Sequence, residues 1–238
     1  MSRVAIVAAL EREVRPLVGG WQVVEKQHSG RSFRFFENDS TVLVCGGMGA
    51  EAARRAAEAV IALFHPALVC SAGFAGALDP ALKVGSIMQP RRVVNAGDGS
   101  SVSLDNGDGV LVSFASVASP AQKAKLRESF GAQAVDMEAA AVARAAEARD
   151  VGFTAVKAIS DEADFAFPAL ERFVDNDGHF HETRFACFAA LRPWLWLRVL
   201  RLARNSGQAS RALCERLRSL LAEENVSHQP ASEAIERR

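Results

Sequence analysis

RVAIVAA, residues 3–9, is a nearly unbroken apolar run rich in β-branched side chains. A strand that is covered on both faces has this composition, because neither face carries alternating polar residues. Thr41–Cys45, Ala67–Ala72 and Phe153–Ile159 are similar runs, and helix-forming segments such as Ala50–Phe64 lie between them. Strands that alternate with helices predict an α/β domain with a largely parallel or mixed sheet.

The composition excludes several classes of protein. The 238 residues include 28 basic and 28 acidic side chains, so the formal net charge is zero, and 49% of the residues are apolar. A disordered chain is less apolar, and a nucleic-acid binder needs a surplus of Lys and Arg. No run reaches the roughly 18 apolar residues of a transmembrane helix. The four scattered cysteines fit a reducing compartment, so we expect a cytoplasmic protein without a signal peptide.

Two glycine-containing segments follow predicted strands. Gly46–Gly49 lies between a strand and a helix, and we expect Gly73–Gly76 to form a loop. Gly47 begins a pattern like a dinucleotide-binding turn, but the next strand lacks the acid that would hold a ribose. The alternatives are a tight strand-to-helix turn, or a loop whose N–H groups approach an anion, a water or a ribose.

Three acidic residues lie where an α/β sheet binds its ligands, beyond the carboxyl ends of strands. Glu13 follows the first strand, Glu138 lies in the first turn of a helix predicted from Asp136, and Asp161 follows the strand 153–159. Convergence on one site is one interpretation. The alternatives are an exposed helix residue for Glu13, a favourable charge at a helix N-terminus for Glu138 and an N-cap for Asp161.

Five short motifs connect these features. They are ALEREV at residues 9–14, GGMG at 46–49, SAGFAG at 71–76, VDMEAA at 135–140 and AISD at 158–161. In this order they resemble the nucleoside phosphorylase superfamily, and within it 5′-methylthioadenosine/S-adenosylhomocysteine nucleosidase. The resemblance implies a single α/β domain whose central mixed β-sheet is distorted toward a barrel and flanked by helices.

The resemblance also implies an enzyme that cleaves an N-ribosidic bond, which leaves positive charge on the ribose and negative charge on the base at the transition state. Asp161 would be the general acid that protonates adenine at N7, a role that burial favours, and Glu13 would orient or deprotonate an attacking water. The implied substrate-binding residues are Glu138 for the ribose hydroxyls, Met137 for the sugar face, Ser160 for positioning Asp161, and Gly47, Phe74, Val117 and Ala118 around the substrate.

Departures from the family pattern bear on the nucleophile and on the substrate. No aromatic residue stands near Val117 to stack on the base, and Phe74 replaces a small or hydroxyl residue where phosphorylases bind phosphate. The phosphate-binding arginines have no convincing counterpart. Water is therefore favoured as nucleophile, inorganic phosphate stays an alternative co-substrate, and no cofactor or metal is expected. Residues 97–109 form a shorter segment than usual, which predicts an open 5′ side.

Residues 192–218 hold seven arginines and one glutamate, a local net charge of +6 in a chain whose total is zero. We expect a helical region over 192–222, broken near Asn205–Gly207, with Arg198 and Arg201 on one face and apolar residues opposite. A basic amphipathic helix with tryptophans can lie on an anionic bilayer. Packing against the domain or across a dimer interface is the alternative.

This C-terminal sequence, with Phe185 upstream, resembles the hopanoid-biosynthesis-associated phosphorylase subgroup. The resemblance implies adenosylhopane, an adenine nucleoside with a triterpenoid at its 5′ position, as substrate. A methylthioadenosine-type nucleosidase and a non-catalytic nucleoside-binding or membrane-associated module are the alternatives. We expect a homo-oligomer in peripheral contact with the inner membrane face. The expected parts are a catalytic domain over 1–191, a basic helical extension over 192–224 and a flexible tail over 225–238.

A polar segment over 175–181 carries two aspartates and two histidines. Their spacing matches no calcium loop or zinc site, so we expect a surface turn there rather than a metal centre.

Overall fold

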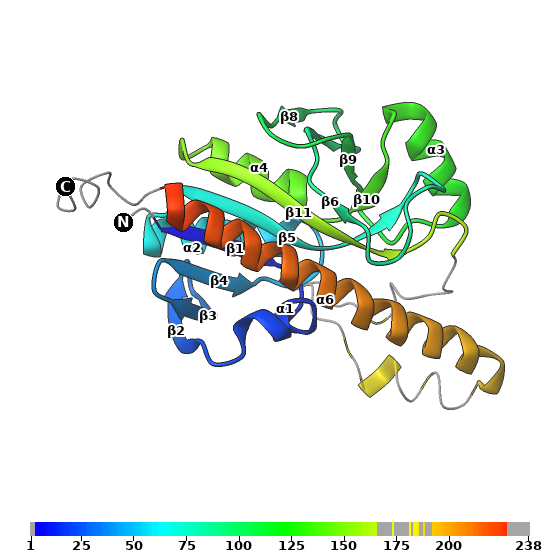
Figure 1. The fold of residues 1–238 in the computed structure, drawn as a ribbon, viewed down its shortest axis with the longest axis horizontal. Helices are drawn as coiled ribbons and strands as arrows, with labels where there is room; N and C mark the ends of the chain where they lie inside the picture. Colours follow the sequence, from blue (N-terminus) through cyan, green and yellow to red (C-terminus); the bar gives the residue numbers. More distant parts are fainter. Residues whose placement is uncertain are drawn as a thin grey trace, which may run out of the picture.

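The computed structural model describes residues 3–165 and 192–227, together with Phe173, His181, residues 183–185 and Phe188. In this part of the chain a mixed sheet of eleven strands carries helices on both faces (Figure 1), which confirms the predicted fold class. The strands are β1 (Val4–Ala8), β2 (Gln22–His28), β3 (Arg31–Asn38), β4 (Thr41–Cys45), β5 (Leu68–Ala77), β6 (Ile87–Met88), β7 (Arg92–Asn95), β8 (Ser101–Ser103), β9 (Val110–Ser113), β10 (Ala134–Asp136) and β11 (Gly152–Asp161). The helices are α1 (Glu11–Val18), α2 (Ala50–Phe64), α3 (Pro120–Phe130), α4 (Ala139–Glu147), the 3₁₀ helix η2 (Pro193–Leu195) and α6 (Trp196–Ser227).

Strand β1 lies in the middle of the sheet and is buried on both sides, as its composition predicts. It pairs in parallel with β4 and with β5. Ala5 and Val7 pack into the cluster formed with α2 and α4, whereas Ile6 and Ala8 pack into the cluster formed with α1 and α6. The alternation of side chains along a strand divides one apolar run between two cores.

Strand β5 joins two parts of the sheet. Its first half pairs in parallel with β1 as far as Ser71, and its end pairs antiparallel with β10 at Gly76 and Ala77. Residues 72–75 of β5 pair with neither β1 nor β10. The ladder with β1 ends before this interval, and the ladder with β10 begins after it. Strand β11 pairs with β5 through this interval, and the loop predicted at Gly73–Gly76 is therefore wrong: the strand continues.

Helix α6 runs diagonally across one face of the sheet (Figure 1). Its second half is part of the core, with Leu213 and Leu217 fully buried. The predicted break near Asn205–Gly207 is wrong, because the helix continues through it. A glycine inside a helix costs about 1 kcal/mol, whereas each buried leucine contributes about 2 kcal/mol, so packing outweighs the local preference.

Smaller differences concern segment ends. The strand predicted over residues 86–94 is two strands, β6 and β7, with Pro90 between them, and residues 97–109 include β8. The helices predicted over 168–191 lie mostly outside the described residues. None of the described helices combines the length and the apolar character that crossing a bilayer requires.

Candidate active site

A cavity of about 430 Å³ lies over the interval of β5 between the ends of β1 and β10. The strand ends supply its polar wall, and α6 covers the opposite side with Val199, Leu202 and Ala203. The fold therefore brings together residues that are distant in sequence. Of the nine predicted site residues, the following line the cavity: Glu13, Phe74, Val117, Ala118, Met137, Glu138, Ser160 and Asp161.

Gly47 is the ninth predicted residue, and it is not among the residues that line the cavity. Its backbone N–H donates to the carbonyl of Ala9 at 3.0 Å, and the neighbouring Met48, not Gly47, lines the cavity. The N–H of Gly49 donates instead to the Glu138 carboxylate at 2.8 Å. The GGMG segment is thus a strand-to-helix turn that anchors an acid of the site.

Glu13 is buried, so its interpretation as an exposed helix residue is wrong. Its side chain is 5% exposed, and Oε2 has no hydrogen-bond partner among the described residues. Burial, and then the nearby Glu138 carboxylate, raise the pKa of Glu13 from 4.5 to about 7. Gly73 of β5 makes room for this group, because a Cβ atom there would lie 2.9 Å from Oε2.

Glu138 immediately precedes α4 and makes no capping bond with its side chain. The helix N-terminus is satisfied by Asp136 instead, whose Oδ2 accepts from the N–H of Ala139 at 2.8 Å. The Glu138 carboxylate accepts from the N–H groups of Gly49 and Met137. Burial, and then the charge of Asp136, raise the pKa of Glu138 to about 7. Glu138 thus lies at the N-terminus of α4, as one interpretation of the sequence predicted, and its carboxylate is also part of the cavity wall.

Lys157 balances part of this negative charge, a role that was not predicted from the sequence. Its ammonium lies 2.9 Å from Asp136 Oδ2 and donates to Ser71 Oγ at 3.1 Å, with 1% of the side chain exposed. Burial disfavours the charged form, but Asp136 and Glu138 outweigh burial and raise the pKa of Lys157. A sequence signal existed, since this lysine interrupts the apolar run of β11.

Asp161 is positioned by an irregularity at the end of β11. The pairing with β5 shifts between Ile159 and Asp161, and such a bulge redirects the side chains around it. Ser160 Oγ donates to Asp161 Oδ1 at 2.8 Å, as a positioning role for Ser160 requires. The other oxygen, Oδ2, forms an ion pair with the buried Lys123 of α3, a second lysine whose role was not predicted from the sequence.

The fold and the three acids are those expected for the family that the sequence motifs resemble, and comparison with known proteins identifies the same family. The family model described as "Phosphorylase superfamily" matches residues 3–115 and 108–191. The chain belongs to this superfamily, as the five motifs predicted.

Individual relatives share little sequence identity with this chain, but each of them is a nucleosidase or a futalosine hydrolase. The chain is 23% identical over 199 residues to the aminodeoxyfutalosine nucleosidase of Campylobacter jejuni, which covers 68% of this chain and 87% of the relative. The futalosine hydrolase structure of Helicobacter pylori superimposes with a TM-score of 0.70 at 18% identity over 93% of this chain and 98% of that one. For the 5′-methylthioadenosine/S-adenosylhomocysteine nucleosidase of Neisseria meningitidis, in complex with methylthio-immucillin-A, the TM-score is 0.65 at 21% identity, over 92% of this chain and 100% of that one.

Among the described residues, no group of three or more His, Cys, Asp or Glu side chains is arranged to hold a metal ion. Within the polar segment 175–181 only His181 is described. The surface turn expected there stays a prediction.

Proposed function

We propose that the protein hydrolyses the N-ribosidic bond of a 5′-substituted adenosine and releases adenine. The observation that carries the proposal is the convergence of Glu13, Glu138 and Asp161 on one cavity at the ends of β1, β10 and β11. Membership of the phosphorylase superfamily and the nucleosidase relatives support the same class of reaction.

Each acid matches one requirement of the reaction. Glu138, fixed by two backbone N–H groups, keeps lone pairs for the ribose hydroxyls, and Met137 lies beside it against the sugar face. Glu13 has a pKa of about 7, so near neutral pH it can accept the proton of an attacking water. Asp161 protonates the departing base at N7. The negative wall stabilises the positive charge that develops on the ribose.

Water fits this wall better than phosphate does. An attacking phosphate dianion would approach Glu13 and Glu138, and the repulsion between like charges at short range is strong in a buried site. Phe74 adds an apolar side chain to the same cavity. A neutral water meets neither obstacle.

For the substrate we propose adenosylhopane. The cavity of about 430 Å³ is in the usual range of about 300–1,000 Å³ for small-molecule sites, and a nucleoside with a triterpenoid would extend beyond it. The wall formed by Val199 and Leu202 of α6 is apolar. This wall leads toward the start of the helix, where Leu197 is 82% exposed and Leu200 66% exposed.

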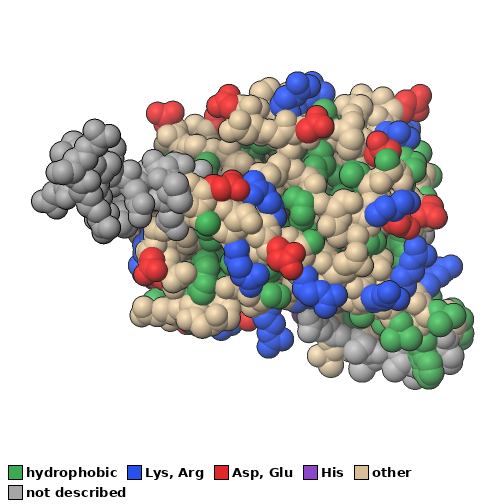
Figure 2. All heavy atoms as spheres, viewed as in Figure 1, with side chains coloured by type: hydrophobic (Ala, Val, Ile, Leu, Met, Phe, Trp, Pro, Cys, Tyr) green, Lys and Arg blue, Asp and Glu red, His purple; other side chains and the backbone are tan. Residues whose placement is uncertain are grey.

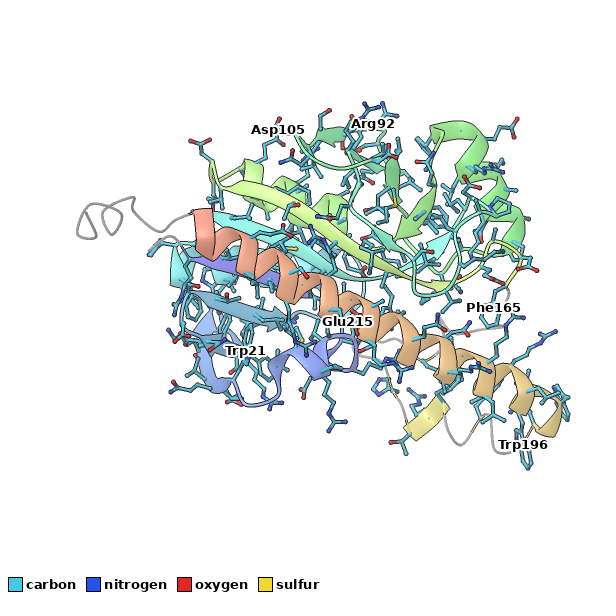
Figure 3. All side chains as sticks on the ribbon, in the orientation of Figure 1. Trp21, Arg92, Asp105, Phe165, Trp196 and Glu215 are labelled. Atoms are coloured by element: carbon cyan, nitrogen blue, oxygen red, sulfur yellow. The ribbon has the colours of Figure 1, made fainter. Side chains whose placement is uncertain are left out.

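The same end of α6 suits contact with an anionic bilayer. Trp194 is 72% exposed and Trp196 53% exposed, and Trp196 points away from the sheet (Figure 3). Figure 2 shows hydrophobic side chains gathered at this end, with Lys and Arg side chains beside them. Tryptophan and leucine can enter the interface while Arg198 and Arg204 contact lipid headgroups. A lipid-tailed substrate would then reach the cavity from the membrane.

The test of the reaction is adenine release from adenosylhopane and from methylthioadenosine, each with and without phosphate. We expect release without phosphate, and faster release from adenosylhopane. Release that requires phosphate would refute hydrolysis. Preference for methylthioadenosine would favour the alternative, a nucleosidase for small 5′ substituents, which the similarity to the Campylobacter and Neisseria nucleosidases supports. Release from neither would leave a non-catalytic binding module.

The test of membrane contact is co-sedimentation with vesicles that contain phosphatidylglycerol. We expect the double variant Leu197→Ser, Arg198→Glu to lose binding. Arg211→Glu changes an exposed arginine more than three turns further along α6 and should bind as the unmodified protein does. Equal binding of all three proteins would remove the membrane proposal and leave the reaction untouched.

A further inference from the structure

Lys123 is an unusual residue for its position. It occupies a core-facing position of α3, where Leu126 is the other buried residue, and its side chain is 3% exposed. It also lies in the first turns of that helix, where the macrodipole disfavours a cation. A buried lysine at such a place is costly unless a partner compensates for it.

The compensating partner is Asp161. The ammonium of Lys123 forms an ion pair with Asp161 Oδ2 and donates to the carbonyl of Glu162 at 2.8 Å. Gly76 of β5 permits the contact, because a Cβ atom there would lie 2.9 Å from Asp161 Oδ2 and 3.3 Å from Lys123 Nζ. Lys123 and Asp161 both line the cavity, so the pair is part of the site.

The other charged groups around Lys123 are paired with different partners. Glu162 directs its carboxylate to Arg201 at 3.2 Å and to Lys83 at 3.7 Å. On α3 itself, Arg127 lies 3.6 Å from Asp79, and on β10 the carboxylate of Asp136 pairs with Lys157. Asp161 is therefore the acid with which Lys123 forms its ion pair.

In this ion pair the ammonium of Lys123 is the donor and Asp161 Oδ2 the acceptor, so the hydrogen between the two groups comes from the lysine. We propose that Lys123 supplies this proton through Asp161, as a positioning and proton-supplying residue. The inference rests on the proposed cleavage of an adenine nucleoside. Lys123 Nζ–H passes its proton to Asp161, and Asp161 passes it to N7 while the C1′–N9 bond breaks and its electron pair leaves with the base. Water adds to C1′ and loses a proton to Glu13. Solvent then reprotonates Lys123 and takes the proton from Glu13.

Two substitutions of Lys123 distinguish its role as a proton donor from its role as the positive partner of Asp161. Lys123→Met has a similar length and no charge, so Asp161 must take its proton from solvent. Lys123→Arg keeps the ion pair, but a guanidinium does not give up its proton in this range of pH. Lys125→Met, two residues away and exposed, is the matched control.

The experiment is the pH profile of kcat and of KM for adenine release by all four proteins, with thermal unfolding to verify that each is folded. For Lys123→Met we expect a kcat loss of about 10-fold at pH 5 and about 1,000-fold at pH 8, with KM within about 3-fold. Lys123→Arg should lose a similar factor at pH 8, and Lys125→Met should match the unmodified enzyme.

The outcomes separate the two proposals. A Lys123→Met profile that parallels the unmodified one, or a Lys123→Arg enzyme of normal activity, would overturn the role of Lys123 while adenine release stands. No release by the unmodified protein would overturn the proposed function, and with it the role of Lys123.

Discussion

The two ends of the cavity balance charge in opposite ways. Around Glu13, three carboxylates share one buried ammonium, because Glu138 and Asp136 join Glu13 beside Lys157. At the other end, Asp161 and Lys123 form a pair of one acid and one cation. An excess of negative charge suits a developing ribosyl cation, and a neutral pair with mobile protons suits a departing base. Charge is therefore distributed along the cavity in the direction in which the proposed reaction would separate it.

Removing the acid of the neutral pair should have the largest effect on activity. Asp161→Asn keeps the shape of the side chain but cannot relay a proton, and it leaves Lys123 without its anion. We expect kcat to fall by about 1,000-fold or more in an adenine-release assay. Ser160→Ala, which removes a single hydrogen bond to Asp161, is the control and should lose about 10-fold or less. Activity of Asp161→Asn near that of the unmodified enzyme would contradict the assignment.

Removing the cation of the acidic end should mainly affect stability. Lys157→Met leaves Asp136 buried with no ammonium, and breaking a buried pair in this way costs about 3–5 kcal/mol. Chemical denaturation at pH 7 measures the free energy of unfolding. The loss should become smaller at low pH, because Glu13 and Glu138, each with a pKa of about 7, take up protons there and need the ammonium less. A loss that is equal at pH 5 and pH 8 would show that packing, not charge, is responsible.

Removing one acid from the crowded end should stabilise the protein at high pH. Glu13 has a pKa of about 7 when folded and 4.5 ordinarily, so between these values the folded protein holds a proton that the unfolded chain has released. Stability therefore falls as pH rises through this window and stays reduced above it. Glu13→Gln should recover up to about 3 kcal/mol at pH 8 and little at pH 4.5, while kcat drops. Thermal unfolding of both proteins at the two pH values measures this difference in stability. An equal change in stability at pH 8 and pH 4.5 would contradict the raised pKa of Glu13.

How far the sequence predicts this arrangement depends on what each residue must do. The apolar run of β1 follows from periodicity, and the acids at strand ends follow from the geometry of α/β sheets. The structure buries the run between two cores and places the acids around one cavity. Lys123 was missed because a lysine on a helix is usually solvated, and nothing local marks its face as buried. The continuation of β5 through Gly73 was missed because glycines that admit a carboxylate look the same in sequence as glycines that form a turn.

A methyl group added at Gly73 tests how closely the acidic end is packed. In Gly73→Ala the new Cβ would lie 2.9 Å from Glu13 Oε2, so the carboxylate must move. We expect a loss of about 10-fold in kcat, because small displacements of a catalytic group are costly. The assay is adenine release with stability measured in parallel. Normal activity would mean that the position of Glu13 is not critical.

The smallest effect is expected for Gly207→Ala, which is the control for the substitution at Gly73. Gly207 lies inside α6, and a Cβ atom there would meet nothing within 4 Å. Gly207→Ala should raise the free energy of unfolding by about 1 kcal/mol through helix propensity and leave kcat unchanged. Thermal unfolding and the same assay measure both. A fall in stability would indicate that the helix needs its glycine.

Helix α6 also sets the order in which the site is completed during synthesis. The acids of the cavity have all been translated by residue 161, but their cover, residues 199–206, and Ser210, which donates to the carbonyl of Glu13 at 2.9 Å, follow about 40 residues later. Until α6 has been translated, the acids lack the side chains that cover them in the folded protein. A nascent chain therefore contains every acid of the site before it contains the site.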